Sequence, residues 1–240
     1  MNKTPYIVLL LAGGKGCRMH SDRPKQFLEV AGATVISYPL KAFQQHDEID
    51  KIYVVCSQEW SDLVNQIAQK ENITKFVRTL PAGSTSIDSI RNGIEGIRKD
   101  DENTNPVVIL HEAVRPLISG EIITRNLQTF REKGNAITAI RSHEAYMVST
   151  DGISSTASIP REELYRAQTP QTFCLKDIET AFDLADRQGL QGSQSLYTLM
   201  TETLKEQPLY MAQGSELNFK LTVPEDIKTL KAILAYRKND

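Results

Sequence analysis

The first stretch of the chain that could do chemistry combines glycines with cations. Residues 11–19 read Leu-Ala-Gly-Gly-Lys-Gly-Cys-Arg-Met, and Pro-Lys-Gln follows at 24–26. Glycines let the backbone turn sharply and approach a ligand closely, and successive N–H groups in such a turn form a concave anion site. With Arg18 and Lys25 as added cations, the stretch suits a nucleoside triphosphate, the alternative being a simple tight turn. Its spacing is neither that of the P-loop nor that of the dinucleotide fingerprint.

Three later stretches carry further candidates. Glu112 follows an apolar run, and its carboxylate suits Mg²⁺, which takes carboxylate and phosphate oxygens; the alternative is a buried salt bridge with Arg115 at the end of a strand. The stretch 166–173, Arg-Ala-Gln-Thr-Pro-Gln-Thr-Phe, is predicted from spacing alone to be a polar loop. Lys220 taken alone is more often a solvated strand residue than a ligand.

Composition excludes several other classes of protein. The 240 residues have a net charge of −2, so nothing indicates a nucleic-acid surface. No apolar run reaches membrane-spanning length, and the three cysteines do not form a disulfide framework, so we expect a cytoplasmic protein. The four histidines lack the spacing of zinc ligands, and no nucleophile-elbow or catalytic-cysteine signature is present. These histidines are His20, His46, His111 and His143.

Apolar runs alternate with helical patterns, which is typical of βαβ units and a mostly parallel sheet. Right-handed crossovers then place the loops after the strands along one edge. Strands are predicted at Ile7–Leu11, Ile52–Cys56, Phe76–Leu80, Val107–Leu110, Ala136–Ile140 and Leu209–Ala212, and helices at Val35–Gln45, Glu59–Lys70, Ser86–Arg98, Glu121–Lys133, Leu175–Arg187, about Tyr197–Lys205 and from Pro224 onward.

The alternation breaks after Arg141. Residues 143–163 alternate weakly around a turn at Asp151-Gly152, as a hairpin does. A two-stranded ribbon is only marginally stable alone, so we expect this arm to pack on something else, a second subunit being one option. The simplest prediction is one domain over residues 1–240 with an arm at about 143–163.

Taken together, the motifs resemble one family of cytidylyltransferases, the family of the enzymes for 2-C-methyl-D-erythritol 4-phosphate and D-ribitol 5-phosphate. The match runs in order from residue 7 to about 230 and is specific for the family more than for the substrate. The second glycine at Gly14 and the pair Glu59-Trp60 look closer to the ribitol-phosphate branch. The residues that carry the resemblance are Leu11-Ala12-Gly13-Gly14, Gly16, Arg18-Met19, Pro24-Lys25-Gln26, Val114-Arg115-Pro116, Gln168-Thr169-Pro170-Gln171, Phe173, Asn218, Lys220, Thr222 and Pro224-Glu225-Asp226.

The resemblance implies a fold and a reaction. The fold is a single Rossmann-like nucleotidyltransferase domain of the α/β class, with a mostly parallel mixed sheet and a β-hairpin arm that reaches the partner's site in a homodimer. The reaction is Mg²⁺-dependent transfer of CMP from CTP to a polyol phosphate, for CDP-ribitol synthesis or isoprenoid biosynthesis. By position, Arg18, Lys25 and Lys220 look like the catalytic cations, Glu112 like the metal ligand, Arg161 and Thr169 like contacts to the polyol phosphate, and Ala12, Gly13, Gly14, Gly16, Gly83, Ser84 and Ser89 like nucleotide-binding residues.

The chain departs from the family at its acceptor end. Glu112 replaces the usual Asp, Ser86 replaces an Arg, and two pairs that carry hydroxyl or carboxylate groups become Glu144-Ala145 and Leu196-Tyr197. Either the acceptor therefore differs from both known polyol phosphates, or the activity is reduced, and the sequence does not decide which polyol phosphate is used. Two rival functions also remain: a sugar-1-phosphate nucleotidylyltransferase, and a CTP-binding protein with a degraded acceptor site.

Overall fold

A computed structural model describes residues 4–14, 23–102 and 104–237. Seven strands form one sheet in the order β11-β7-β10-β6-β1-β4-β5. All of the neighbouring pairs are parallel except those of β10, which runs antiparallel to both β6 and β7. The mostly parallel mixed sheet predicted from the sequence is therefore confirmed. The seven strands are β1 (Tyr6–Leu11), β4 (Lys51–Cys56), β5 (Phe76–Pro81), β6 (Val107–Glu112), β7 (Ala136–Arg141), β10 (Tyr165–Cys174) and β11 (Met211–Gln213).

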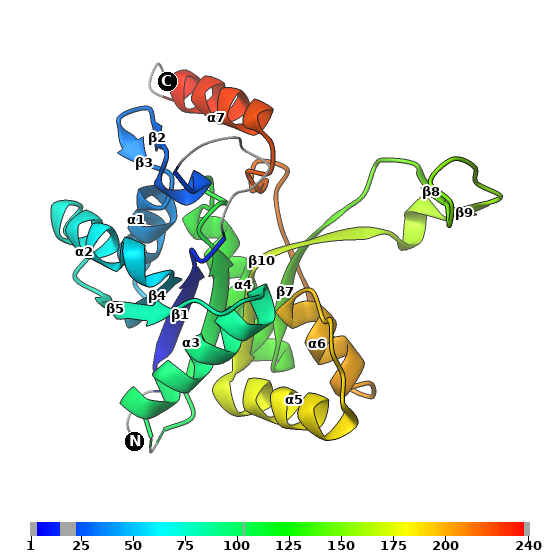
Figure 1. The fold of residues 1–240 in the computed structure, drawn as a ribbon, viewed down its shortest axis with the longest axis horizontal. Coiled ribbons are helices and arrows are strands. Elements are labelled where there is room, and N and C mark those ends of the chain that lie inside the picture. The colour runs from blue at the N-terminus through cyan, green and yellow to red at the C-terminus, as the bar shows by residue number, and fades with distance from the viewer. Residues whose placement is uncertain (1–3, 15–22, 103, 238–240) are drawn as a thin grey trace.

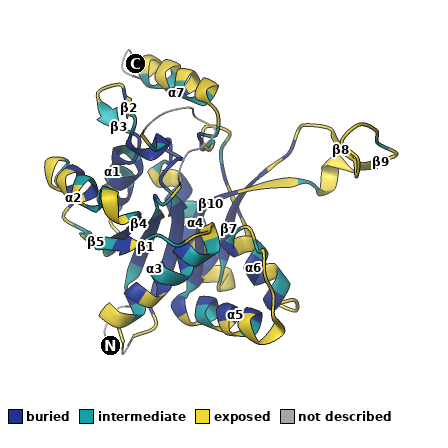
Figure 2. Cartoon of the chain, in the orientation of Figure 1, coloured by how far each residue is buried: buried dark blue, intermediate teal, exposed yellow. Residues whose placement is uncertain are grey.

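Helices cover both faces of the sheet (Figure 1). The central strands are apolar at almost every position because each face of the sheet meets a helix layer, and Figure 2 shows them as the buried centre of the molecule. One layer holds α1, α2 and α4 and the other holds α3, α5 and α6, while α7 packs at the carboxyl-end edge. The helices are α1 (Ser37–Gln45), α2 (Ser61–Lys70), α3 (Ser86–Asp100), α4 (Gly120–Lys133), α5 (Leu175–Gln188), α6 (Leu196–Thr203) and α7 (Pro224–Tyr236).

The stretch around Thr169 corrects one prediction. Residues 166–173 are not a polar loop, because they lie inside the long strand β10, and residues 168–173 are buried. Their polar groups have partners far away in the chain: Thr172 Oγ1 donates to Asn126 Oδ1, and Asn126 Nδ2 donates to the Pro170 carbonyl at 2.9 Å. A strand of polar residues is stable in the core when its side chains are paired in this way.

The predicted hairpin is present as an arm that projects from the rest of the molecule (Figure 1). Its strands β8 (Tyr146–Val148) and β9 (Ala157–Ile159) pair only with each other and are exposed throughout. A second small hairpin, β2 (Glu29–Val30) with β3 (Ala33–Thr34), was not predicted. None of the helices in the described part of the chain has the length and apolarity needed to cross a membrane.

Candidate active site

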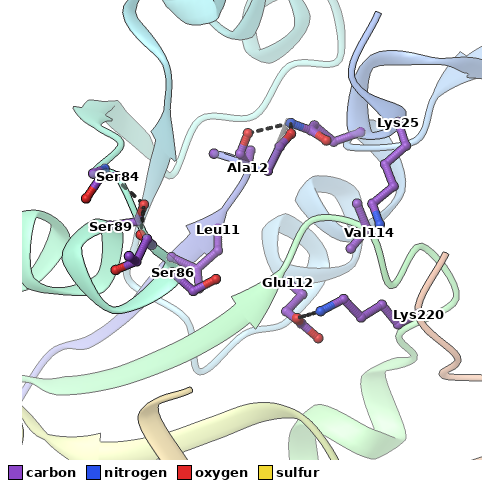
Figure 3. Close-up of a pocket in the computed structure, with 14 residues that line it drawn as sticks. Leu11, Ala12, Lys25, Ser84, Ser86, Ser89, Glu112, Val114 and Lys220 are labelled. Atoms are coloured by element: carbon purple, nitrogen blue, oxygen red, sulfur yellow. Dashed lines mark hydrogen bonds and ion pairs between the residues drawn. The ribbon is translucent and has the colours of Figure 1, made fainter. Parts of the chain in front are cut away.

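The carboxyl ends of β1 and β6 and the loop between β5 and α3 line a cavity of about 470 Å³, which is within the usual range for ligand pockets. Figure 3 shows its walls: Ser84 and Ser89 lie on one side, Lys25 and Lys220 lie on the other, and Ala12 lies between them. Many of the predicted site residues therefore come together here. The residues that line the cavity are Leu11, Ala12, Gly13, Gly14, Lys25, Gln26, Gly83, Ser84, Thr85, Ser86, Ser89, Glu112, Val114 and Lys220.

The glycine-containing turn after β1 is built for close backbone approach. A Cβ on Gly13 would lie 2.8 Å from the Cβ of Ala82, so only glycine fits there without a shift. Gln26 holds the turn from the other side, because its Nε2 donates to the carbonyls of Ala12 and Gly14 at 2.6 and 2.9 Å. Gly16 and Arg18, which the sequence assigned to this site, lie outside the described residues.

The wall beside this turn is the amino end of α3. Thr85 caps this helix, since its Oγ1 accepts from Asp88 N at 3.0 Å while the Asp88 carboxylate accepts from Thr85 N. Ser89 Oγ accepts from Gly83 N at 3.0 Å, which holds the preceding loop against the helix. A helix amino end with free N–H groups favours an anion, so this wall suits a phosphate-bearing ligand.

Glu112 stands at the centre of a charged triad at the end of β6. Its carboxylate accepts from Arg115 Nε at 2.7 Å and from Lys220 Nζ at 2.5 Å (Figure 3). Burial works to raise the pKa of Glu112, but the two cations and their hydrogen bonds outweigh burial and hold the pKa at about 2. The salt bridge with Arg115, which the sequence left as the alternative to metal binding, is thus present, and Lys220 joins it from a segment outside any strand.

The segment that carries Lys220 is fixed to the sheet edge by hydrogen bonds. Leu221 N donates to the Val114 carbonyl at 2.8 Å, and Arg115 Nη1 donates to the Asn218 carbonyl at 2.8 Å. Lys25, which is almost fully buried, donates from Nζ to the Leu221 carbonyl at 2.6 Å. Both predicted catalytic lysines therefore line the cavity, with Lys220 paired to Glu112 and Lys25 bonded to the residue after Lys220.

A smaller cavity of about 230 Å³ adjoins the first one and shares Leu11, Ser86, Glu112 and Lys220 with it. Thr169 lies at this second cavity, where its Oγ1 accepts from the backbone N–H of Glu112 at 3.1 Å. Arg161, on the exposed arm, is not among the residues that line either cavity. The second cavity is further lined by Ile90, Leu110, Arg115, Ala167, Gln168, Gln171, Gln194, Ser195 and Leu196.

Sequence reasoning missed several residues of this site. Gln26 could have been found, since it follows Lys25 in the Pro-Lys-Gln motif. Thr85 also had a signal, because Thr-x-x-Asp before a helical pattern is typical of a capping box. His111 had none, because its hydrogen bond to Thr169 joins two strands that are far apart in the sequence, and the burial of Gln171 inside β10 had none either.

Burial lowers the pKa of His111 to about 3, although the hydrogen bond of the ring to the Arg115 carbonyl works to raise it. At this pKa the ring is neutral at pH 7.

Comparison with known proteins agrees with this geometry. Residues 6–236 match the family described as 2-C-methyl-D-erythritol 4-phosphate cytidylyltransferase. The chain is 34% identical over 238 residues, 98% of its length and 97% of the relative's, to the ribitol-5-phosphate cytidylyltransferase of Streptococcus agalactiae serotype V. It is 30% identical over 220 residues, 92% of its length and 93% of the relative's, to the 2-C-methyl-D-erythritol 4-phosphate cytidylyltransferase of Clostridium botulinum.

Solved structures show the same fold. The crystal structure of 4-diphosphocytidyl-2C-methyl-D-erythritol synthase from Anaerococcus prevotii superposes with a TM-score of 0.82 at 24% identity, covering 97% of this chain and 96% of the other. Nucleotidyltransferases work by positioning their substrates and neutralising charge. The cavity offers the features that this needs, namely a glycine-containing turn, a capped helix end and two lysines. The chain belongs to the 2-C-methyl-D-erythritol 4-phosphate cytidylyltransferase family and is a nucleotidyltransferase of the cytidylyltransferase type.

Proposed function

We propose that this protein transfers CMP from CTP to ribitol 5-phosphate, giving CDP-ribitol and pyrophosphate. The observation that carries the proposal is the pair of adjoining cavities with Glu112 and Lys220 in their common wall. The larger cavity suits the nucleotide, and the smaller one suits a short polyol phosphate. Several of the relatives with about a third of residues identical are ribitol-5-phosphate cytidylyltransferases, which favours ribitol 5-phosphate over 2-C-methyl-D-erythritol 4-phosphate.

In the reaction, an oxygen of the polyol phosphate forms a bond to the α-phosphorus of CTP. The bond from that phosphorus to the oxygen bridging the β-phosphate breaks, and pyrophosphate leaves. The acceptor phosphate must therefore lie against the triphosphate, at the wall shared by the two cavities. Negative charge that grows on the phosphate oxygens there is stabilised by Lys25 and Lys220, with Arg18 assigned the same role by resemblance.

We assign the metal to Glu112. The residues present fit Mg²⁺, because the ionised Glu112 carboxylate faces the cavity and Mg²⁺ commonly takes one or two carboxylates plus substrate phosphates. The described residues hold no group of three or more His, Cys, Asp or Glu that could bind a metal ion, so the remaining ligands would come from the nucleotide. When bound, Mg²⁺ neutralises triphosphate charge; Lys220 would then move from Glu112 to the phosphates.

We further propose that the whole chain is one domain, works in the cytoplasm where CTP is made, and forms a homodimer through the arm. The arm exposes apolar side chains, with Met147 75% and Ile153 93% exposed, and such a surface is commonly covered by a partner. Arg161 at the base of this arm would contact the polyol phosphate of the partner's site. Light scattering at micromolar concentration tests the dimer, and a monomer would remove the role of Arg161.

The test of the activity is a panel assay of pyrophosphate release with CTP and Mg²⁺. The acceptors are ribitol 5-phosphate, 2-C-methyl-D-erythritol 4-phosphate and a sugar 1-phosphate. We expect the fastest turnover with ribitol 5-phosphate, and turnover of the sugar 1-phosphate alone would support the rival nucleotidylyltransferase. CTP binding without release of pyrophosphate from any acceptor would favour a degraded acceptor site. The substitutions at Glu112, Ser86, Glu144-Ala145 and Leu196-Tyr197 motivate this alternative.

A further inference from the structure

Lys220 lies in a segment that belongs to no helix or strand, so its backbone needs another support. The residues before it, 214–218, form a turn after β11, in which Asn218 N donates to the Ser215 carbonyl at 3.0 Å. Lys220 follows two residues after this turn. The position of its backbone therefore depends on how the turn is attached to the sheet.

Gln168 of β10 holds the turn with both ends of its side-chain amide. Its Nε2 donates to the Ser215 carbonyl at 2.9 Å, and its Oε1 accepts from Ser215 N at 3.4 Å. Because a carbonyl oxygen can only accept, the orientation of this amide is fixed. The turn also packs closely on it, since a Cβ on Gly214 would lie 2.5 Å from Gln168 Oε1. The turn is therefore attached directly to β10.

Asn218 makes the attachment that lies nearest to Lys220 in the chain. Its side chain is fully buried, and its Nδ2 donates to the Thr169 carbonyl of β10 at 2.8 Å. The same nitrogen lies 3.4 Å from Gln168 Oε1. Two oxygens thus face this nitrogen, so the site requires a donor. Removing Asn218 Nδ2 would leave the buried Thr169 carbonyl without this hydrogen bond, which is costly in the interior.

Arg115 connects the backbone of Asn218 to the charged triad. Its Nη1 donates to the Asn218 carbonyl at 2.8 Å, while its Nε donates to Glu112 at 2.7 Å. Glu112 also accepts from Lys220 Nζ at 2.5 Å. The lysine is therefore held at two points, by Glu112 at its charged end and through Asn218 at its backbone. When the contact with Glu112 opens, the attachment through Asn218 remains.

An exposed ion pair joins the same turn to the same strand, between Glu216 and Arg166 of β10. The two side chains are 60% and 48% exposed. Exposed pairs of this kind contribute little to stability. The buried amide contacts are therefore the ones that fix the turn.

We propose that Asn218 is a positioning residue for Lys220: its buried side chain fixes the backbone of the lysine to β10, so that only the lysine side chain rearranges when its pair with Glu112 opens. The inference rests on the proposed function for the action of Lys220 on the substrate phosphates. A group that stabilises a transition state must be placed accurately, and a misplacement of about 1 Å can cost ~10²-fold in rate.

The first test measures kcat and KM with CTP, Mg²⁺ and ribitol 5-phosphate for Asn218→Ala, Lys220→Ala and the double variant. For Asn218→Ala we expect kcat to fall about tenfold, the scale of one neutral hydrogen bond, with KM for CTP changed less than about twofold. The double variant should be within about twofold of Lys220→Ala, because residues that act through one another are not additive. An unchanged kcat in Asn218→Ala, or losses that multiply in the double variant, would overturn the proposal.

The second test does not depend on any enzymatic activity. Leu221 N donates to the Val114 carbonyl at 2.8 Å, so the exchange of this amide with deuterium reports on the backbone beside Lys220. Asn218→Ala should speed up the exchange of the Leu221 amide about tenfold, since one hydrogen bond that keeps the segment closed is lost. Exchange at the wild-type rate would mean that Asn218 does not fix the segment.

The matched control is Asn126→Ala. Asn126 is also fully buried, and its Nδ2 donates to the Pro170 carbonyl of β10 at 2.9 Å, but it has no hydrogen bond to residues 214–221. It should leave the exchange of the Leu221 amide unchanged, and any loss of kcat should multiply with that of Lys220→Ala.

Asn218→Ser takes the place of Asn218→Ala if the alanine variant does not fold, with the same outcomes expected. Failure of the proposed function is distinguishable. The wild type would then turn over none of the polyol phosphates, whereas the exchange of the Leu221 amide would still decide whether Asn218 fixes the backbone beside Lys220.

Discussion

Replacing Glu112 by Gln should destabilise the protein at pH 7, and the loss of stability should become smaller as the pH falls. The change keeps the size of the side chain and removes the charge that faces Arg115 and Lys220. Lys220 is partly exposed and can be solvated, but the Arg115 side chain is only 10% exposed. A mostly buried guanidinium without its counter-charge is unfavourable.

The size of the effect follows from the pKa of Glu112, which lies at about 2 in the folded protein and at 4.5 without its neighbours. One pKa unit corresponds to about 1.4 kcal/mol, and the side chain is 22% exposed, so solvent screens part of the interaction. We expect Glu112→Gln to lower the free energy of unfolding by about 2–3 kcal/mol at pH 7. Because the folded pKa is depressed, the stabilisation is complete above pH 4.5 and is lost as the pH falls toward 2.

The assay is urea unfolding followed by circular dichroism, for wild type and variant, at steps between pH 7 and pH 3. The difference between the two proteins should stay constant down to about pH 5 and shrink to roughly half by pH 3. The control is Glu216→Gln, which loses an exposed ion pair with Arg166 and should change stability by less than about 0.5 kcal/mol. A difference below that value at pH 7, or one that does not change with pH, would refute the reasoning.

Further predictions concern the cavity and the nucleotide. Lys25→Ala and Lys220→Ala should each lower kcat by ~10²-fold or more with an unchanged circular dichroism spectrum; near wild-type turnover would refute the role of that lysine. Gly83→Ala should raise KM for CTP by about tenfold or more, because a Cβ there would lie 2.2 Å from Asp88 Cβ and 2.8 Å from the backbone nitrogen of Ser89, whereas Gly120→Ala, with nothing within 4 Å, is the neutral control. CTP should be preferred to UTP, ATP and GTP in a pyrophosphate-release assay, and equal use of a purine nucleotide would contradict this.

Most of the sheet could be predicted because its strands are buried on both faces. The continuous apolar runs of β1, β4 and β6 follow from that burial, and such runs can be recognised as strands in the sequence. The strand β10 could not be recognised in this way. Its buried residues Thr169 and Thr172 are polar, and their partners lie 46 or more positions away in the chain.

The same distinction holds for the site, where contacts between residues close in the sequence could be predicted and contacts between distant residues could not. The Glu112–Arg115 bridge spans three residues and could be weighed from the sequence, while the contact of Glu112 with Lys220 spans 108 positions. The two lysines were assigned by resemblance, and the structure shows that both of them line the cavity. The hydrogen bond between Thr169 and His111 joins two neighbouring strands, and no local pattern encodes it.

The way the arm joins the sheet bears on how such enzymes could diversify. The arm is an insertion between two adjacent antiparallel strands, and its base is closed by the pairing of Tyr165 with Arg141 and by the bond from Ser142 N to the Leu164 carbonyl. The pairing register of β7 with β10 is therefore set by residues outside the arm. Residues 143–163 can therefore be lengthened or shortened without moving the cavity at the carboxyl ends of the strands, so that the contacts of the arm can change during evolution while that cavity stays the same.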